Sequence, residues 1–407
     1  MLQDFKGFED LVFLVGDTEL LGGMRACVAR PPFANESILF LDTLSRRLLG
    51  RREARAYSDV VAFAFWCRKG STREMMAAYP DLGDRLGRGV AFHVAPSNVP
   101  VNFAFSLAMG LLTGNANVVR LPSTDFPQVA LICDAVKDAL CEMPEMAPDV
   151  CLLRYGHQPD INDTLSALCD TRVIWGGDRT IETFRRSPLH SRAIDITFAD
   201  RYSICLIDAD RYLEMPGRES IAGNFFTDTL LTDQNACSSP RIVVWLGRET
   251  TRARAAFWGA FEAEARSRYR LQPAIAVEKL ASLCRLAVAV DGTRMVSGCG
   301  NLASRVEVPA LSGGIDAYFG YGGFFLEYRA VAIDEILPLC GRRCQTLSVL
   351  GVGQAAIDEF LMRYRPAGID RVVPMGRTMD FGLRWDGYDL PYVMTRCRSM
   401  QPFAPIR

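Results

Sequence analysis

Residues 89–104 read GVAFHVAPSNVPVNFA, and this stretch predicts the fold class. Its first part, Val90–Val94, is apolar except for one histidine, which is typical of a strand buried on both faces. A turn rich in Pro, Ser and Asn follows, and Phe103–Thr113 is apolar nearly all round, as expected of a helix packed on a sheet. A buried strand that runs through a turn into such a helix is the beginning of a βαβ unit.

The alternation of strand and helix continues toward the C-terminus. Further strands are predicted at 116–120, 149–154, 171–175, 193–198 and 203–207. The helices predicted between them cover 126–140, 161–169 and 179–186. We therefore expect an α/β fold with a doubly wound parallel sheet up to about residue 208.

A second alternation follows, from a helix near 218–231 to another at 355–364, and it predicts a second α/β domain. On this basis we divide the chain into a first domain, a second domain and a C-terminal tail, at 1–208, 209–372 and 373–407. The first domain includes a largely helical segment at 1–88.

The composition excludes several classes of protein. Of 407 residues, 49% are hydrophobic and 23% are charged, as in ordinary soluble globular proteins, and a net charge of -1 argues against nucleic acid or anionic membrane as a partner. The N-terminus lacks the pattern of a signal peptide, and the longest apolar runs are too short to span a membrane. Thirteen cysteines without framework spacing indicate reduced thiols in the cytoplasm. The three histidines have no zinc spacing, so we expect no metal site, and we interpret His93 as a core residue.

Three turns follow the ends of predicted parallel strands, where doubly wound sheets bind ligands. They are Pro96-Ser97-Asn98, Pro122-Ser123 and Gly176-Gly177-Asp178. The two glycines allow a close backbone approach, and the helix that follows offers N–H groups to an anion such as pyrophosphate; the alternative is a plain strand–helix turn. Asn98 is either a donor to a developing oxyanion or the cap of the next helix.

Residues 225–246 read FFTDTLLTDQNACSSPRIVVWL and place Cys237 between a polar turn and a β-rich run. A free cysteine is usually a small buried hydrophobe. The neighbours of Cys237 are polar, among them Gln234, Asn235 and Ser238, and they suit a nucleophile better than a core thiol. The residues alone leave both roles open.

Four motifs together resemble the aldehyde dehydrogenase superfamily in order and spacing. They are APSNVPVNFA at 95–104, VVRLPS at 118–123, VIWGGDRT at 173–180 and DQNACSSPR at 233–241. They are more similar to its bacterial acyl-CoA reductase branch, the LuxC-type fatty acyl reductases, and residues 368–390 resemble that branch alone. The resemblance covers about 88–390. It implies a cofactor-binding first domain, a catalytic second domain, and a tail that packs back or supports a homo-oligomer.

The resemblance also implies roles for single residues. Cys237 matches the nucleophile, whose thiolate would attack an acyl-CoA or carrier-bound thioester before hydride from a nicotinamide releases an aldehyde. Asn98 matches a donor to the acyl oxygen. The positions that hold the cofactor's adenosine and pyrophosphate are matched by Ser97, Pro122, Ser123, Gly176 and Gly177. Glu335 is positioned like the glutamate that holds the nicotinamide ribose.

Two departures from the superfamily pattern bear on the cofactor and the reaction. Leu121 replaces the lysine that usually precedes the Pro-Ser pair, so Arg120 is the nearest cation, either for a 2′-phosphate or as a structural residue. We expect NADPH, with NADH as the alternative. The stretch AIDITFADRYSI at 193–204 lacks the usual general-base glutamate. Asp195 and Asp200 remain there, as cap or ion-pair residues or as a substitute base.

Without a placed base, hydrolysis of an acyl-cysteine should be slow, which favours NAD(P)H-dependent reduction of an acyl thioester to an aldehyde. The alternatives are an aldehyde or semialdehyde dehydrogenase and a non-catalytic scaffold that has kept the fold. The branch also implies a partner synthetase that hands over the acyl group.

Overall fold

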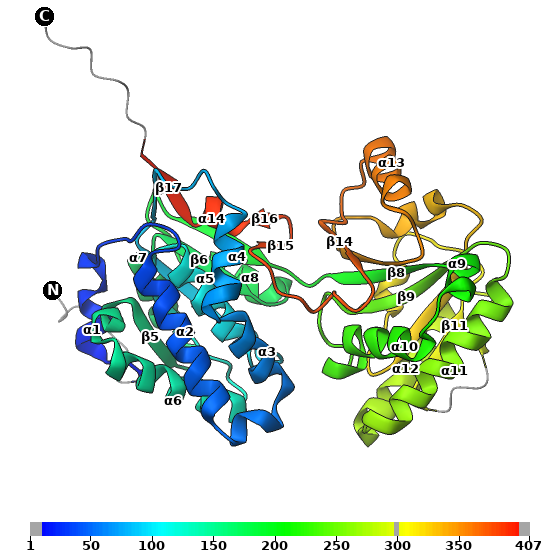
Figure 1. The fold of residues 1–407 in the computed structure, drawn as a ribbon, viewed down its shortest axis with the longest axis horizontal. Helices are drawn as coiled ribbons and strands as arrows, with labels where there is room; N and C mark the ends of the chain where they lie inside the picture. Colours follow the sequence, from blue (N-terminus) through cyan, green and yellow to red (C-terminus); the bar gives the residue numbers. More distant parts are fainter. Residues whose placement is uncertain (1–9, 297–300, 399–407) are drawn as a thin grey trace, which may run out of the picture. The chain divides into compact units, whose positions relative to one another are not determined.

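The computed structural model describes residues 10–296 and 301–398, which form two compact units (Figure 1). Unit 1 consists of residues up to Ala199 together with those from Leu383 onward, and unit 2 is Asp200–Gly382. Residues 399–407 of the expected tail lie outside the described residues. In the part of the chain that is described, no helix is both long enough and apolar enough to cross a membrane.

Unit 1 is built on a six-stranded sheet in the order β1-β5-β4-β3-β6-β7. The strands are β1 (Val12–Val15), β3 (Val90–Val94), β4 (Ala116–Arg120), β5 (Val150–Arg154), β6 (Thr171–Trp175) and β7 (Ile194–Phe198). All pairs are parallel except β1 with β5. Every residue of β3 is buried, because β3 lies in the middle of the sheet with helices packed on it. The parallel sheet predicted from the sequence is confirmed.

The helices of unit 1 alternate with strands from β3 onward, as the sequence predicts, and helices α2, α3 and α4 come one after another before β2 (Arg85–Gly87). They are α1 (Thr18–Gly23), α2 (Asn35–Gly50), α3 (Ser58–Trp66), α4 (Lys69–Ala77), α5 (Asn102–Leu112), α6 (Pro127–Glu142), α7 (Pro159–Leu168) and α8 (Asp178–Arg185). Helix α5 buries nine of its eleven residues, which explains its nearly uniform apolar sequence.

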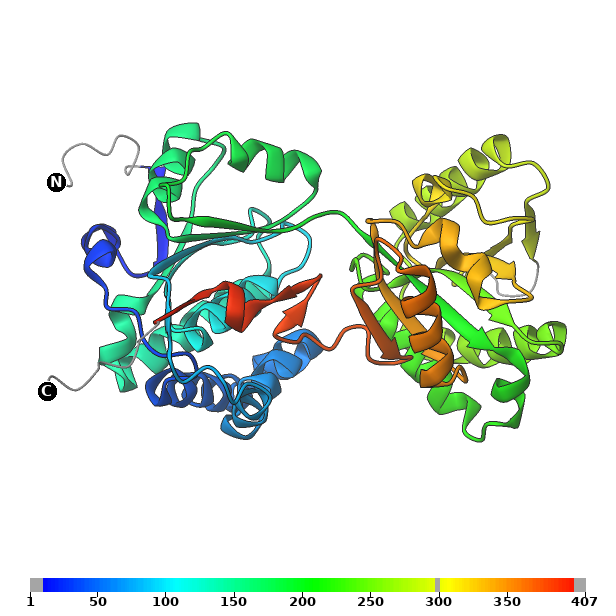
Figure 2. The same ribbon diagram turned by 90° about the horizontal axis from the view of Figure 1, so that it is seen from above.

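The described end of the tail returns to unit 1. Strand β17 (Thr395–Cys397) pairs antiparallel with β2 (Arg85–Gly87), and Nε of Arg85 donates to Oγ1 of Thr395 at 2.6 Å. The short elements β15 (Arg384–Trp385), β16 (Tyr388–Asp389) and α14 (Leu390–Val393) precede it, in red in Figure 2. The described tail therefore packs back onto its own chain.

Unit 2 is built on a seven-stranded sheet in the order β10-β11-β12-β9-β8-β13-β14. The strands are β8 (Tyr202–Asp208), β9 (Pro240–Leu246), β10 (Arg294–Val296), β11 (Ser304–Glu307), β12 (Phe324–Arg329), β13 (Cys344–Leu350) and β14 (Arg371–Pro374). The sequence predicts β8 as the last strand of the first sheet. In the structure it lies between β9 and β13, because it pairs with both, so the chain passes from unit 1 to unit 2 before residue 208.

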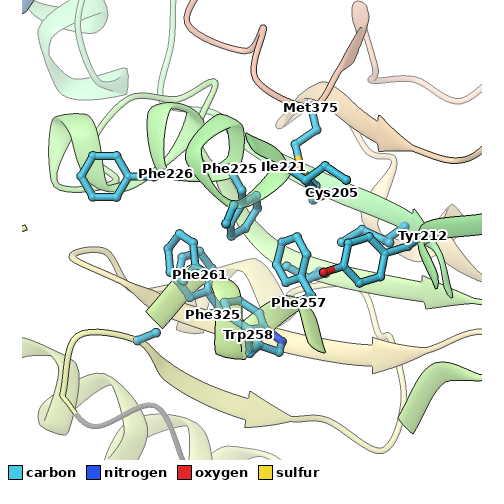
Figure 3. Close-up of a cluster of buried hydrophobic side chains, with 14 of the residues drawn as sticks. Cys205, Tyr212, Ile221, Phe225, Phe226, Phe257, Trp258, Phe261, Phe325 and Met375 are labelled. Atoms are coloured by element: carbon cyan, nitrogen blue, oxygen red, sulfur yellow. The ribbon is translucent and has the colours of Figure 1, made fainter. Parts of the chain in front are cut away.

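Helices cover both faces of this second sheet. They are α9 (Ala209–Glu214), α10 (Arg218–Asp228), α11 (Thr250–Arg268), α12 (Pro273–Ala289) and α13 (Gln354–Tyr364). Under α10 and α11 lies an aromatic cluster in which the ring of Phe225 is 5.2 Å from those of Phe257 and Phe261 (Figure 3). Such pairs contribute roughly 0.5–1.5 kcal/mol each beyond their buried area. On the other face, side chains of α12 and α13 join a second core, which makes unit 2 doubly wound.

Candidate active site

Cys237 lies in unit 2, in the loop that leads into β9. Its thiol is half-buried, and Nε2 of Gln345 donates a hydrogen bond to Sγ at 3.3 Å. Gln345, at a bulge in β13, is only 2% exposed, so its amide is held in place by packing. The hydroxyl of Ser203 donates to the backbone carbonyl of Cys237 at 2.8 Å. The thiol is therefore in a polar setting at the amino end of the strand.

Other cysteines have the apolar setting that Cys237 lacks. Cys133 and Cys151 are buried, and burial raises the pKa of each thiol to about 12. Burial also raises the pKa of Cys205, which belongs to the aromatic core of unit 2. A thiol with so high a pKa is protonated at neutral pH and is a poor nucleophile. Among the cysteines of unit 2, the environment of Cys237 fits the sequence interpretation of a reactive thiol.

The loop before Cys237 is held rigidly by its own residues. Asp233 and Gln234 both adopt left-handed backbone conformations, with φ of 51° and 57°. The buried amide of Gln234 donates to the carbonyl of Pro240 at 2.8 Å and accepts from the N–H groups of Gly323 and Phe324 at 2.9 and 3.1 Å. The side chain of Gln234 therefore connects the cysteine loop to β12, and both its amide nitrogen and its amide oxygen are hydrogen-bonded to the backbone.

Two arginines place positive charge near the thiol. Burial lowers the pKa of Arg241 to about 10, so it stays protonated at neutral pH, and a negative charge on Cys237 opposes the shift. Its Nη1 donates to the carbonyl of Gly320 at 2.6 Å. Burial also lowers the pKa of Arg371, with Cys237 among the groups that raise it. A thiolate at this position would be stabilised by both guanidinium groups and by the amide of Gln345.

The loop after β14 is clamped next to the cysteine loop. Asp228 accepts hydrogen bonds from the N–H groups of Gly376 at 2.7 Å and Thr378 at 3.0 Å, while Arg371 donates to the carbonyl of Thr378 at 2.8 Å. The hydroxyl of Ser238 in turn donates to the sulfur of Met379 at 3.5 Å. Part of the C-terminal motif at 368–390 therefore packs against the nucleophile loop.

Asp228 should make stability depend on pH. Burial raises the pKa of this carboxyl to about 6, against the lowering effect of its two backbone donors. This value lies above the ordinary pKa near 3.9. The folded state therefore binds more protons than the unfolded state between these values, and the contribution of Asp228 to stability falls as the pH rises through 6. In Asp228→Asn this part of the pH dependence should vanish. Urea unfolding of both proteins at pH 5, 6 and 7 measures it, and parallel curves would contradict the expectation.

Gln345 should set the reactivity of Cys237. A hydrogen bond to a charged group contributes roughly 1.5–3 kcal/mol, so in Gln345→Leu the rate of Cys237 alkylation by iodoacetamide at neutral pH should fall by about tenfold. Mass spectrometry of the Cys237 peptide gives the rate. Gln354→Leu, the same change at an exposed position of helix α13, is the matched control and should label at the unaltered rate. Equal rates in all three proteins would show that the contact does not activate the thiol.

The residues predicted to hold the cofactor's adenosine and pyrophosphate meet at one edge of the unit 1 sheet. The turns after β3, β4 and β6 follow neighbouring parallel strands, and the hydroxyls of Ser97 and Ser123 lie 3.0 Å apart. Pro122 is buried beside Ser123, and Gly176 begins the turn after β6. At Gly177 a Cβ would meet nothing within 4 Å and φ is -64°, so nothing in the described protein requires a glycine there. Space of this kind beside a helix N-terminus fits a bound anion.

Arg120 and Glu335 are engaged within the protein. The guanidinium of Arg120 lies 4.6 Å from the ring centre of Tyr155 and donates to the carbonyl of Gly156 at 2.9 Å, which fits the structural alternative. The carboxylate of Glu335 caps the short helix Ile333–Leu339, and it accepts from Tyr328 at 2.6 Å. The cofactor roles of both residues stay predictions.

The two carboxylates considered as substitute bases are in ion pairs. Asp195 accepts from Nε and Nη2 of the buried Arg172 at 2.7 and 2.9 Å. Asp200 lies 3.3 Å from Arg343. His93 is a core residue, as expected: it hydrogen-bonds Ser106 and Asn117 at 2.7 and 3.0 Å, and burial lowers its pKa to about 4.

Asn98 lies in the exposed turn after β3, and its side-chain amide has no hydrogen-bond partner among the described residues. It belongs to unit 1, whereas Cys237 belongs to unit 2. Its role as a donor to the acyl oxygen stays a prediction. Gln345, Arg241 and Arg371, which the sequence interpretation missed, are the residues that the structure places around the thiol. Only Arg241, four positions after Cys237, offers a signal in the sequence.

Comparisons with known proteins bear on the family and the fold of the chain. The family model for acyl-CoA reductase (LuxC) matches residues 71–275, about half of the chain. The long-chain acyl-protein thioester reductase of Aliivibrio fischeri is 27% identical over 165 residues, 39% of this chain and 32% of the relative. The chain thus matches about a third of that relative's length.

Two solved structures show the fold. Aldehyde dehydrogenase 21 from Physcomitrella patens, in complex with the product succinate, superposes with a TM-score of 0.65 at 13% identity, over 95% of this chain and 90% of that one. An indole-3-acetaldehyde dehydrogenase in complex with NAD⁺ gives a TM-score of 0.65 at 14% identity, over 94% and 86%. The aldehyde-dehydrogenase-like fold predicted from the sequence is confirmed. On the strength of the family match, the chain belongs to the acyl-CoA reductase (LuxC) family.

Proposed function

We propose that this protein reduces an acyl thioester to an aldehyde with NAD(P)H, through an acyl group carried on Cys237. The observation that carries the proposal is the half-buried thiol with the Gln345 amide 3.3 Å from its sulfur and two arginines nearby. Family membership and the relative in Aliivibrio fischeri, a long-chain acyl-protein thioester reductase, support it.

In the first half of the reaction, the Cys237 thiolate attacks the thioester carbonyl and forms an acyl-cysteine, while the thiolate of the donor leaves and takes up a proton. The amide of Gln345 and the charges of Arg241 and Arg371 stabilise the attacking thiolate. When bound, a nicotinamide cofactor supplies the hydride for the second half. The bond between carbon and Sγ then breaks, the aldehyde leaves and the thiolate is restored.

The acyl-cysteine must outlast attack by water. Aldehyde oxidation would need a general base that activates water, and Asp195 and Asp200 are both held in ion pairs. An acyl group on Cys237 should therefore hydrolyse slowly. This favours the reductase over the aldehyde or semialdehyde dehydrogenase.

We assign the cofactor to the carboxyl end of the unit 1 strands, where Ser97, Ser123 and Gly177 lie in the turns after β3, β4 and β6. The fit rests on the two hydroxyls and on the open space at Gly177 beside the N-terminus of α8. The indole-3-acetaldehyde dehydrogenase of the same fold was solved with NAD⁺. We propose NADPH as the physiological cofactor, with Arg120 and Glu335 as further ligands, because the branch resemblance favours it.

The acyl donor is proposed to be acyl-CoA or a carrier-bound acyl group, in some settings supplied by a synthetase.

We also propose a homo-oligomer, supported by an exposed apolar stripe on α12 with helical spacing: Val277, Leu280, Cys284 and Val288. Glu278 and Arg285 flank it and would face each other in an antiparallel pair. Ultracentrifugation of Leu280→Glu tests whether this stripe forms the oligomer contact.

The free thiols of the described cysteines support a reducing, cytoplasmic location.

Intact-protein mass spectrometry after mixing with acyl-CoAs of different chain length, without cofactor, tests the function. We expect one acyl adduct per chain, on Cys237, for the accepted lengths. A protein that forms no adduct with any thioester, yet oxidises aldehydes with NAD⁺, would be a dehydrogenase. A protein that neither forms an adduct nor oxidises aldehydes would support the third alternative, a non-catalytic scaffold that has kept the fold.

A further inference from the structure

A second cluster of charged side chains lies in unit 2, at the edge of the sheet formed by β10, β11 and β12. It lines a pocket of about 360 Å³ between these strands and helix α11. Four arginines contribute to the lining, and they are Arg254, Arg294, Arg305 and Arg329. Neither Cys237 nor Gln345, which donates to its sulfur, lines this pocket.

The period-two alternation of the strands brings these residues onto one face. Arg305 and Glu307 are two positions apart on β11 and therefore share a face, and so do Glu327 and Arg329 on β12. Glu307 lies directly beside Glu327 in the parallel register. Two carboxylates on neighbouring strands repel each other, so the arrangement requires positive charge around them.

Glu327 is fully buried, and its carboxylate is saturated by donors. Oε1 accepts from the indole nitrogens of Trp245 and Trp258 at 3.0 and 2.7 Å. Oε2 accepts from Nη2 of Arg254 at 2.9 Å and from Nε of Arg305 at 2.9 Å. One buried carboxylate therefore holds two buried guanidinium groups.

Glu307 forms ion pairs with three of the four lining arginines. It lies 2.6 Å from Nη2 of Arg294, 3.2 Å from Nε of Arg329 and 3.4 Å from Nη1 of Arg254. The other lining carboxylate, Glu262, is paired with Arg266 of its own helix. Four guanidinium groups and two carboxylates, Glu262 and Glu307, thus line the pocket, and with the buried Glu327 beside them the positive charges still outnumber the negative ones. The excess of positive charge is held partly out of water, where it is costly unless an anion balances it.

The pocket is separate from the cysteine. Glu307 and Arg329 are the last residues of β11 and β12, whereas Cys237 precedes the first residue of the parallel strand β9. Arg329 is in register with Trp245, five residues after the first residue of β9, and at roughly 3.3 Å per residue this places Arg329 about 16 Å along the strand from Pro240. A ligand here would not touch the thiol.

We propose that this pocket binds a small anion that bears phosphate. Guanidinium forks match phosphate oxygens in pairs, and four of them around one pocket suit a ligand with more than one negative charge. Arg294 and Arg329 are substantially exposed and can reach an entering anion, while the buried Arg254 and Arg305 are fixed by Glu327. At Gly259 on α11, a Cβ would meet nothing within 4 Å, so space is open on the helix side.

Calorimetric titration of the full-length protein with inorganic pyrophosphate, at constant ionic strength set with sodium chloride, tests the site. We expect saturable binding and a raised melting temperature. Arg294→Gln and Arg329→Gln should each weaken binding by about tenfold, the usual effect of losing one charge-assisted hydrogen bond. Gly259→Leu, which fills the pocket without changing the charge, should weaken it as well.

Arg252→Gln is the matched control, because Arg252 is exposed on the same helix and does not line the pocket. It should bind as the unaltered protein does. Absence of saturable binding, or an equal loss in Arg252→Gln, would overturn the proposal, and so would unchanged binding by Gly259→Leu. Cys237→Ala should still bind pyrophosphate, so failure of the proposed reductase function would leave this result untouched.

Discussion

Replacement of Cys237 by alanine is expected to abolish acyl-enzyme formation and to lower the rate of thioester reduction by at least about 10⁴-fold, since removal of a covalent nucleophile leaves only binding and positioning. The loss should appear in kcat, because the substitution leaves the residues proposed to hold the cofactor unchanged, and Ser97, Ser123 and Gly177 lie in unit 1. Intact mass spectrometry with acyl-CoA and NADPH turnover measure the two effects. The affinity for NADPH, measured by fluorescence titration, should stay within about twofold.

Cys284→Ala serves as the control, because this cysteine is also in unit 2 but exposed on α12. It should form the adduct and turn over normally. If Cys237→Ala lost cofactor binding together with acylation, the thiol would be structural. If Cys237→Ala still formed the adduct, the nucleophile would be another residue.

Glu327→Gln should have the largest effect on stability. The side chain keeps its shape but loses its charge, so Arg254 and Arg305 are left buried with one fewer negative partner. Breaking a buried ion pair from one side costs about 3–5 kcal/mol. Urea unfolding should show this loss, and the backbone amides of β12 should exchange faster with solvent.

Glu262→Gln is the matched control for this substitution. Glu262 forms an i, i+4 pair with the exposed Arg266 on α11, and such pairs contribute less than about 1 kcal/mol. A loss of stability in Glu262→Gln as large as that in Glu327→Gln would show that burial of the cluster does not set its energy.

Most of the fold could be predicted from the sequence, because strands such as β3 and β4 are mostly apolar segments followed by helical ones, a pattern typical of a parallel sheet covered on both faces. Strand β8 shows the limit. Its residues read as a buried strand in either sheet, and only its pairing with β9 and β13 decides which sheet it joins. Periodicity records burial and carries no information about the partner strand.

The sequence could indicate Cys237 as a candidate nucleophile, but it could not indicate which residues surround the thiol. Cys237 stands out because its neighbours in sequence are polar. Gln345 and Arg371 come from strands more than a hundred residues further on, and nothing near them indicates a thiol. Conversely, Gln234 has the residue type and position of a catalytic group, yet its amide is consumed by backbone partners that no local pattern reveals.

The pairing of β2 with β17 has a consequence for synthesis on the ribosome. Strand β2 emerges early, but its partner, residues 395–397, is translated only after the whole of unit 2. Unit 2 can complete its tertiary structure while β2 of unit 1 still has no partner strand. Nascent chains stalled before that point should therefore expose an unpaired strand, a natural target for chaperones and a site of misassembly.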